Sequence, residues 1–353
     1  MIKKCILLSS LVIILLSAKA QKENSAALLQ LSKQHHLKEE SEFNKAVAVA
    51  KSKGWPLIKK NANGSIMSLQ RLDQFGNPEY LTTFNNTIAA ATTRANQLWQ
   101  GGLSGLNLSG SSNSVKGKIG VWDAGLILKN HVELAGRIFQ KDSTAAAAQS
   151  AANRDDDHAT HVTGTIMASG VNPVAKGMAY GLQQIVGYDY NNEISEIAGE
   201  ASNLIISNHS YGIQGGWLYD GTNWNWYGDT TISKESYRFG YYHSSAQMYD
   251  SILYNAPNYM LVFASGNARN SAGPAVGSTY LYNGGTKVTR TSGFSSNPDY
   301  GSVACGQNAK NIITVGAVSG MPYGYAIPSD VVMSSFSSCL LYTSPSPRDG
   351  LLS

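Results

Sequence analysis

The N-terminus carries the first hydrophobic signal of the chain. Lys3 and Lys4 precede an apolar run, Ile6–Leu16, which is followed by Ser17-Ala18-Lys19-Ala20. A charged start, a short apolar stretch and a small-residue A-x-A site are typical of a secretory signal peptide. The run is shorter than the roughly 20 residues of a membrane span, although an uncleaved anchor is the alternative. No cysteine follows the cleavage site to carry a lipid. We therefore expect residues 1–20 to be removed and the protein to be secreted, with no membrane association afterwards.

The next part of the chain changes from a helical to a strand-like pattern. Residues 21–54 are polar and rich in Lys and Glu, and their apolar positions have helical spacing (Leu28, Leu31, Phe43, Val47 and Ala50). Residues 55–84 form short apolar runs separated by turns at Asn63-Gly64 and Gly76-Asn77. We interpret residues 21–90 as a small α+β propeptide with a processing region near Ile88–Thr93; an ordinary N-terminal subdomain is the alternative.

From about residue 115 the pattern is that of an α/β domain. Short apolar runs (Ile119–Trp122, Leu204–Asn208, Tyr259–Ala264 and Asn311–Val318) alternate with helix-length stretches (His158–Ser169 and Ser244–Asn255). Buried apolar strands that alternate with helices indicate a doubly wound, mostly parallel sheet. In such a sheet the chemistry lies at the carboxyl ends of the strands. We assign this domain to residues 91–338.

Composition narrows the function classes. Only 14% of the 353 residues are charged, against about 25% in average soluble domains, so the surface must rely on uncharged polar groups. The net charge is +4 and no basic run interleaves with aromatics, so nucleic acid is not an expected partner. After signal removal only Cys305 and Cys339 remain, which is no disulfide framework.

Two motifs place candidate catalytic groups at a strand end and a helix start. Asp123 closes the run Ile119–Asp123, where a carboxylate can orient a histidine, although such an Asp is more often a turn former or helix cap. His158 lies in Asp157–Ile166 (DHATHVTGTI). Metal binding by Asp155, Asp156, Asp157, His158 and His161 is the alternative, but H-x-x-H lacks the i, i+4 pair and the glutamate of zinc peptidases.

A third motif ends the run Leu261–Ser265 in Gly266-Asn267. A side-chain amide at this position can donate to an oxyanion that develops on a substrate carbonyl. Taken alone, Gly-Asn is an ordinary turn.

In this order, the Asp, His and Asn motifs resemble the subtilisin family of serine peptidases over residues 95–338. Further matches follow in family order: His131–Leu134 (HVEL), Ile206–Gly212 (ISNHSYG), Ile312–Val318 (IITVGAV) and Ser335–Ser338 (SFSS). Ala159 departs from the family, which usually has Gly there.

The resemblance implies a role for each matching residue. His158 is the general base and then the general acid, Asp123 orients its imidazole, and Asn267 donates to the oxyanion. Ser210, Tyr211 and Gly212 form the edge strand that pairs with the substrate backbone. The expected partners are polypeptide substrates and the chain's own propeptide. No cofactor or metal is predicted, and the sequence does not indicate whether the fold binds a structural calcium ion.

The nucleophile of the family lies in G-T-S-x-A, and no such string occurs in the chain. The resemblance stops at Ser338, and Cys339–Asp349 (CLLYTSPSPRD) resembles a translated sequencing adapter; a natural Ser/Pro linker is the alternative. We expect residues 339–353 to be an artefactual, disordered tail. The prediction is a secreted serine endopeptidase whose serine is missing from this chain; the alternative is a non-catalytic, subtilisin-like binding protein.

One aromatic-rich stretch, residues 215–242, has no motif (Trp217, Trp224, Trp226, Tyr227, Tyr237, Tyr241 and Tyr242). It follows the predicted substrate strand. It could wall the binding groove, pack on itself or bind a glycan.

Overall fold

The computed structural model describes residues 23–60, 66–83, 90–141, 155–229, 233–291, 293–298, 301–321 and 323–339. The predicted signal peptide lies outside these residues, as does the predicted tail after Cys339. Within the described part, no helix has the length and apolar character needed to cross a bilayer.

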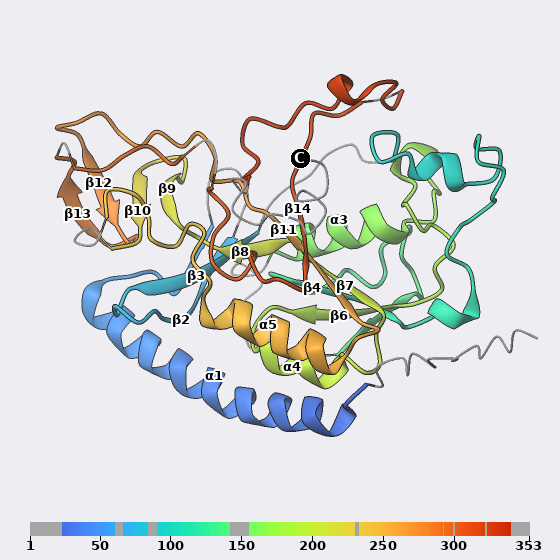
Figure 1. Cartoon of the computed structure of the whole chain (residues 1–353), viewed down its shortest axis with the longest axis horizontal. Coiled ribbons are helices and arrows are strands. Elements are labelled where there is room, and N and C mark those ends of the chain that lie inside the picture. Colours follow the sequence, from blue (N-terminus) through green and yellow to red (C-terminus); the bar gives the residue numbers. More distant parts are fainter. Residues whose placement is uncertain are drawn as a thin grey trace, which may run out of the picture.

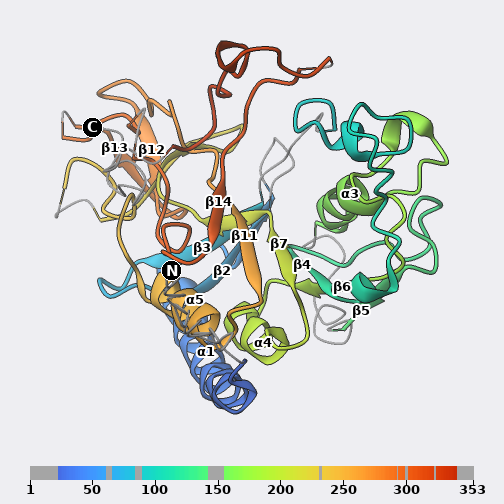
Figure 2. The ribbon, with the colours of Figure 1, turned by 45° about the vertical axis from the view of Figure 1, so that its right-hand side comes forward.

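A six-stranded sheet forms the centre of the α/β domain, in the order β14-β11-β7-β4-β6-β5. Its strands are β4 (Ile119–Asp123), β5 (Ile138–Gln140), β6 (Ile185–Asp189), β7 (Ile206–His209), β11 (Met260–Ala264) and β14 (Ile313–Val315). Every pairing is parallel. Helix α3 (Asp156–Met167) covers one face, and α4 (Glu193–Glu200) and α5 (Ser244–Asn255) cover the other (Figures 1 and 2). The doubly wound, mostly parallel sheet expected from the sequence is confirmed.

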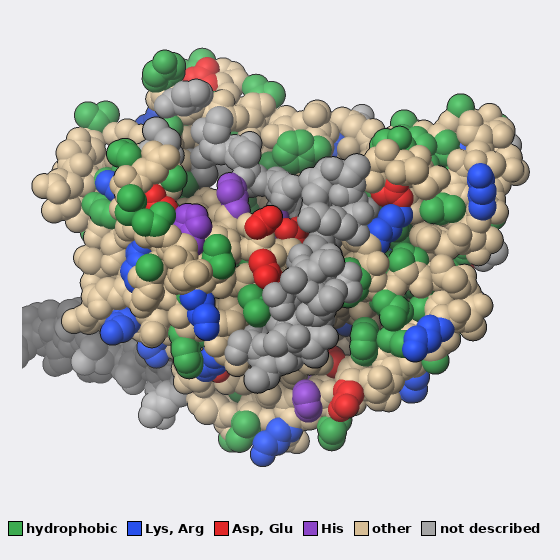
Figure 3. Space-filling view, turned by 180° about the vertical axis from the view of Figure 1, so that it is seen from behind, with side chains coloured by type: hydrophobic (Ala, Val, Ile, Leu, Met, Phe, Trp, Pro, Cys, Tyr) green, Lys and Arg blue, Asp and Glu red, His purple; other side chains and the backbone are tan. Residues whose placement is uncertain are grey.

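The protein surface reflects the low content of charged residues in the sequence. On the face seen in Figure 3, charged side chains are scattered over a surface made mostly of uncharged polar groups and backbone. Short 3-10 turns lie at Ala95–Leu98, Asn113–Val115, Pro173–Ala175 and Pro328–Asp330.

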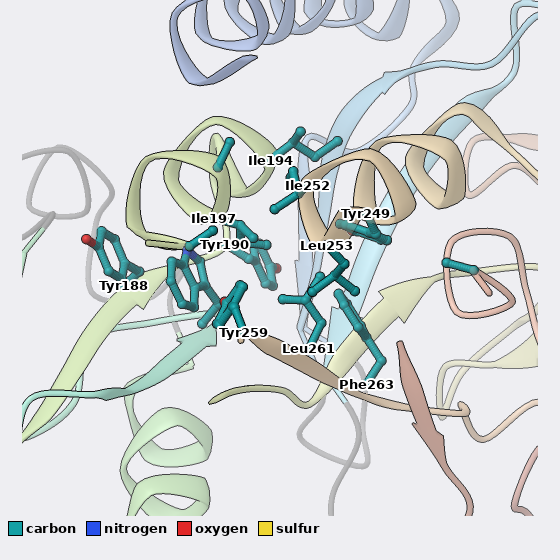
Figure 4. Packing of buried hydrophobic residues seen from close by; sticks show 14 of the residues in the cluster. Tyr188, Tyr190, Ile194, Ile197, Tyr249, Ile252, Leu253, Tyr259, Leu261 and Phe263 are labelled. Atoms are coloured by element: carbon teal, nitrogen blue, oxygen red, sulfur yellow. The ribbon is translucent and has the colours of Figure 1, made fainter. Parts of the chain in front are cut away.

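The core between the sheet and helices α4 and α5 is rich in aromatic rings (Figure 4). Trp122 stacks on Tyr188, with 4.4 Å between ring centroids, and on His209 at 5.3 Å. His209 stacks in turn on Phe263 at 4.3 Å. Full burial lowers the pKa of His209 to about 3, so this imidazole is neutral and part of the core.

An N-terminal unit, defined here as the described residues from Ser25 to Thr83, lies against this core. It consists of α1 (Ser25–Lys53), β1 (Ile58–Lys60), β2 (Ile66–Leu72) and β3 (Pro78–Thr83). The strands pair antiparallel, and α1 packs against α4 and β2 (Figure 1). The side chain of Asn24 caps the start of α1, and Gly54 ends it with a left-handed backbone at φ 68°. The helix and the antiparallel strands follow the sequence pattern; the propeptide assignment and its bounds stay a prediction.

A third sheet, which we call the aromatic sheet, has the order β13-β12-β10-β9. Its strands are β9 (Gly216–Tyr219), β10 (Trp224–Tyr227), β12 (Thr279–Tyr282) and β13 (Thr286–Thr289). Trp217, Trp226 and Tyr280 form a buried cluster. At these positions, therefore, the aromatic residues of the 215–242 stretch pack on one another.

Candidate active site

The carboxyl end of β4 and the first turn of α3 bring Asp123 and His158 together. The two atoms Nδ1 of His158 and Oδ1 of Asp123 lie 2.6 Å apart, and both side chains are buried. Asp123 Oδ1 also accepts a hydrogen bond of 2.7 Å from the backbone amide of Ala124. Asp155 caps α3 by accepting from the amide of His158 at 3.1 Å, so the helix start fixes the backbone that carries the imidazole.

This contact sets the tautomer of His158. A carboxylate only accepts hydrogen bonds, so Nδ1 carries the hydrogen and Nε2 is the basic nitrogen of the ring. An imidazole held in this way can take a proton at Nε2 from an incoming hydroxyl. If it does, the adjacent Asp123 carboxylate stabilises the resulting imidazolium.

Two of the acidic residues before His158 accept hydrogen bonds from backbone amides. Asp155 caps the helix, and Asp156 Oδ1 accepts from the amide of Leu126 at 2.8 Å. His161 is exposed on α3. These contacts give Asp155 and Asp156 structural roles and do not favour the alternative in which they bind a metal ion.

The HVEL match also has a structural role. The carboxylate of Glu133 accepts from the backbone amides of Gly170, Val171 and Asn172, at 2.7 to 3.1 Å, and so holds the loop after α3. These hydrogen bonds lower the pKa of Glu133, the amide of Asn172 most strongly.

Asn267 and Ser210 line one pocket, of about 170 Å³, at the carboxyl ends of β7, β11 and β14. Its walls are Asn208, Ser210, Val262, Phe263, Ala264, Ser265, Gly266, Asn267, Val315, Gly316, Ala317 and Phe336. Asp123 and His158 are not among these residues. Asp123 ends β4, the neighbour of β7 in the sheet, so Asp123 and the His158 ring beside it lie at the same edge of the sheet.

The SFSS match supports the turn before Asn267. Ser338 donates its backbone amide to Gly266 O at 2.8 Å, and its hydroxyl accepts from the amide of Ala268 at 3.1 Å. Ser265 donates its hydroxyl to Ser338 O at 2.9 Å. Ser338 therefore anchors the backbone on both sides of Asn267, at Gly266 and at Ala268.

The predicted substrate strand is already paired with the N-terminal unit. Tyr211 and Gly212 lie in β8 (Tyr211–Ile213), whose partner is β3: Thr83 lies opposite Tyr211, and Thr82 lies opposite Gly212. Tyr211 is buried, and its hydroxyl lies 2.8 Å from His209 Nδ1. Only the backbone of Tyr211 is therefore available for pairing with an extended chain.

Sequence reasoning missed Gln307, which fastens β8. Its Nε2 donates to Tyr211 O at 3.3 Å and to Ala264 O at 3.0 Å, so it joins the substrate strand to the end of β11. The side chain is buried. No motif marks this glutamine, since its partners lie 96 and 43 residues away in the chain.

Among known protein families, the model of the subtilase family matches residues 115–343, which is well over half of the chain. No curated protein matches the chain. The matched range contains Asp123, His158, Ser210 and Asn267 and begins after the N-terminal unit. The chain therefore belongs to the subtilase family of serine peptidases.

Proposed function

We propose that the protein is a secreted endopeptidase in which His158, oriented by Asp123, activates a serine toward peptide bonds. The observation that carries the proposal is the 2.6 Å contact between His158 Nδ1 and Asp123 Oδ1. A buried carboxylate that orients an imidazole at the carboxyl edge of a parallel sheet is the arrangement that acyl transfer needs.

The reaction proceeds in two acyl-transfer steps. The serine oxygen attacks the carbonyl carbon of the scissile bond while His158 Nε2 takes the hydroxyl proton. The oxyanion that forms accepts a hydrogen bond from the side-chain amide of Asn267. The imidazolium then gives its proton to the leaving amine, and water releases the acyl group by the same path. Asp123 stays a carboxylate throughout.

The substrate backbone pairs with the edge formed by Ser210, Tyr211 and Gly212. The antiparallel pairing of β3 with β8 supports this, since it demonstrates that an extended segment fits along Tyr211–Ile213. In this proposal the N-terminal unit is a propeptide that covers the strand until processing. The layout is then a signal peptide (1–20), a propeptide (21–90), a catalytic domain (91–338) and a foreign tail (339–353).

The nucleophile in this scheme comes from sequence that the chain does not contain. The pocket beside Asn267 is bordered by apolar side chains with considerable exposure: Val315 is 48% exposed and Phe336 is 42% exposed. On the edge strand β14, Ile313 is 43% exposed. This apolar surface supports the proposal that a further segment packs here and supplies the serine.

The test compares two proteins. The chain as printed is expected to cleave no casein, whereas a chain in which residues 339–353 are replaced by the genomic continuation is expected to cleave casein and to be blocked by a serine-directed inhibitor. Reading the genomic DNA across codon 338 provides that continuation.

The absence of G-T-S-x-A favours a second candidate, a subtilase that binds polypeptides without cutting them. A genomic continuation that also lacks a serine at a helix start, and that yields no activity, would establish this candidate and reject the endopeptidase.

A further inference from the structure

Strand β3 lies beside β8 and shows the course that an extended chain takes along the α/β domain (Figure 1). Thr83 lies opposite Tyr211, so the next residue of a chain in this register lies opposite Ser210, in the pocket that also contains the predicted oxyanion donor. Past the end of β8, the amide of Gln214 still donates to Tyr80 O at 3.0 Å. An extended substrate in this register therefore contacts the α/β domain for several residues before its scissile bond.

Arg238 of the α/β domain lies further along this course and binds the backbone of β3. Its guanidinium is fully buried and donates to Gln214 O at 2.9 Å and to Pro78 O at 2.7 Å. It also donates to the carboxylate of Asp73 at 3.0 Å. A buried guanidinium stays charged, so it requires an anion close by. In this structure that anion comes from the N-terminal unit.

His243 of the α/β domain contacts the carboxylate of Glu79, in β3. Nε2 of His243 and Oε1 of Glu79 lie 3.0 Å apart, and both side chains are buried. His243 is the N-cap of α5, and its Nδ1 accepts from the amide of Ser245 at 3.3 Å. The hydrogen of the neutral ring is therefore on Nε2, which donates to the carboxylate. Burial alone would raise the pKa of Glu79, but Arg71, His243 and Arg238 outweigh it and lower the pKa to about 2.

Glu79 and His243 also form a group with Cys305 whose donor atoms, all within 4.8 Å of one another, are of the kind that bind metal ions. The hydrogen bonds do not favour a metal here. The hydrogen on Nε2 of His243 occupies the place that a metal ion would take, and Arg71 Nε donates to the other oxygen of Glu79 at 2.6 Å. Burial raises the pKa of Cys305 to about 12, which opposes formation of the thiolate that a metal requires. The group is better suited to holding a carboxylate.

We infer that His243 and Arg238 form a subsite that selects an acidic side chain in the polypeptide substrate, at the position that Glu79 occupies in β3. The inference rests on the proposed function, in which the N-terminal unit covers the substrate strand only until processing. The ion-pair partners of Arg238 and His243 among the described residues are Asp73 and Glu79, and both belong to that unit. A substrate carboxylate that takes the place of Glu79 gives the buried cation an anion again, which favours acidic over neutral side chains there.

The position of the selected acid follows from the register of β3. Glu79 lies four positions before Thr83, and so five positions before the residue opposite Ser210. Successive side chains of a strand point to opposite faces. Leu81 accordingly packs in the core of the α/β domain, whereas Tyr80 packs in the cluster of the N-terminal unit. An acid moved by one position would therefore point away from His243.

The test uses the self-processed chain that carries its genomic continuation. The first peptide begins with the sequence of β3, PEYLTT, and continues with AASASA. A second peptide has Gln in place of the Glu, and a third has Gln there and Glu in place of the Tyr, so that its net charge equals that of the first. Peptides are mixed in pairs and their products are counted by mass spectrometry, which gives the ratio of kcat/KM values whatever the amount of active enzyme.

The first peptide is expected to be cleaved about tenfold faster than either of the others, the equivalent of about 1.4 kcal/mol, which is the scale of a hydrogen bond to a charged group. The masses of the products also identify the bond that is cut. The register predicts cleavage after the first Ala, the residue that lies opposite Ser210.

His243→Asn assigns the preference to the imidazole. Asparagine is a good N-cap residue, so this variant keeps the start of α5 but loses Nε2. Its preference for the first peptide is expected to fall below about threefold, because only Arg238 then supplies a charge-assisted hydrogen bond. His161→Asn, on an exposed histidine of α3, is the matched control and should keep the tenfold preference. If His243→Asn fails to process itself, the comparison of the first and third peptides by the wild-type protein decides.

Three results would overturn the inference and leave the proposed function in place: equal cleavage of the first and second peptides, a third peptide as good as the first, or an unchanged preference in His243→Asn. Cleavage of neither the peptides nor casein would instead reject the proposed function, and this inference with it.

Discussion

Gln307 occupies the space that a side chain at position 212 would need. A β-carbon built on Gly212 would lie 1.7 Å from Gln307 Nε2. The same nitrogen joins Tyr211 O to Ala264 O, so glycine at 212 allows β8 to lie close to the end of β11. The substrate strand is therefore positioned by a buried amide that the motif itself does not include.

Gly212→Ala is expected to displace Gln307 and to destabilise the fold by about 1–3 kcal/mol, the usual range for overpacking. Thermal unfolding measures the loss. Gly164→Ala is the control, because a β-carbon on this α3 glycine meets nothing within 4 Å and a helix favours Ala over Gly. Adding Gln307→Ala should recover part of the loss. A Gly212→Ala protein as stable as the wild type would contradict this account of β8.

The Asp123–His158 pair leads to a prediction for the chain that carries its genomic continuation. His158→Ala should abolish measurable cleavage, and Asp123→Asn should lower kcat about 10⁴-fold because the wrong tautomer of the imidazole is then favoured. Peptide hydrolysis assays measure both. His161→Ala, on an exposed histidine of the same helix, should leave kcat unchanged. Full activity of His158→Ala would remove the basis of the proposed mechanism.

Asn267 should affect turnover more than substrate binding. Loss of one oxyanion donor typically lowers kcat by about 10²–10³, while the ground-state carbonyl depends little on it. For Asn267→Ala we expect such a fall in kcat with KM changed less than about threefold, since the interaction forms mainly in the transition state. A variant with raised KM and normal kcat would instead make Asn267 a substrate-binding residue.

Two neighbouring carboxyl groups, Glu39 on α1 and Glu193 on α4, predict how pH affects the docking of α1. Glu39 accepts from the amides of Ile194 and Ser195 at the start of α4, at 3.2 and 3.3 Å. Burial, followed by the nearby Glu193 carboxyl, raises the pKa of Glu39 from 4.5 to about 7, although Arg71 opposes the shift. The folded protein therefore keeps a proton that the unfolded chain releases above about pH 4.5.

The stability contributed by this proton is complete below pH 4.5 and is lost as the pH rises through about 7. One pKa unit corresponds to about 1.4 kcal/mol, and partial exposure screens the effect, so we expect a loss of about 1–2 kcal/mol between pH 5 and 8. Chemical denaturation at several pH values measures this loss. Glu39→Gln should flatten the profile in this range, whereas Glu40→Gln, on an exposed neighbour, should not. A wild-type protein that becomes more stable from pH 5 to 8 would show that the sign is wrong.

The hydrophobic pattern alone determined the fold class and much of the element order. Strands of a parallel sheet with helices on both faces are largely apolar, so Ile119–Trp122 and Tyr259–Ala264 were detectable as short apolar runs. The helix α5 has the bounds that the pattern predicts, Ser244–Asn255, and α3 starts two residues earlier than predicted. Strands β5 and β6 were not expected. β5 has only three residues, none of them fully buried, and so leaves little pattern to detect.

Only the tertiary structure decided which residues contact one another. The sequence placed Asp123 at a strand end and His158 at a helix start, but only the fold brings these two residues, 35 positions apart, into a 2.6 Å contact. The sequence shows that Tyr227 is aromatic, but it does not reveal that this ring completes a core formed by Trp55 and Met67. The physical reason is that a hydrophobic pattern reports which side chains are buried. Their partners depend on which surfaces meet when segments more than a hundred residues apart pack together.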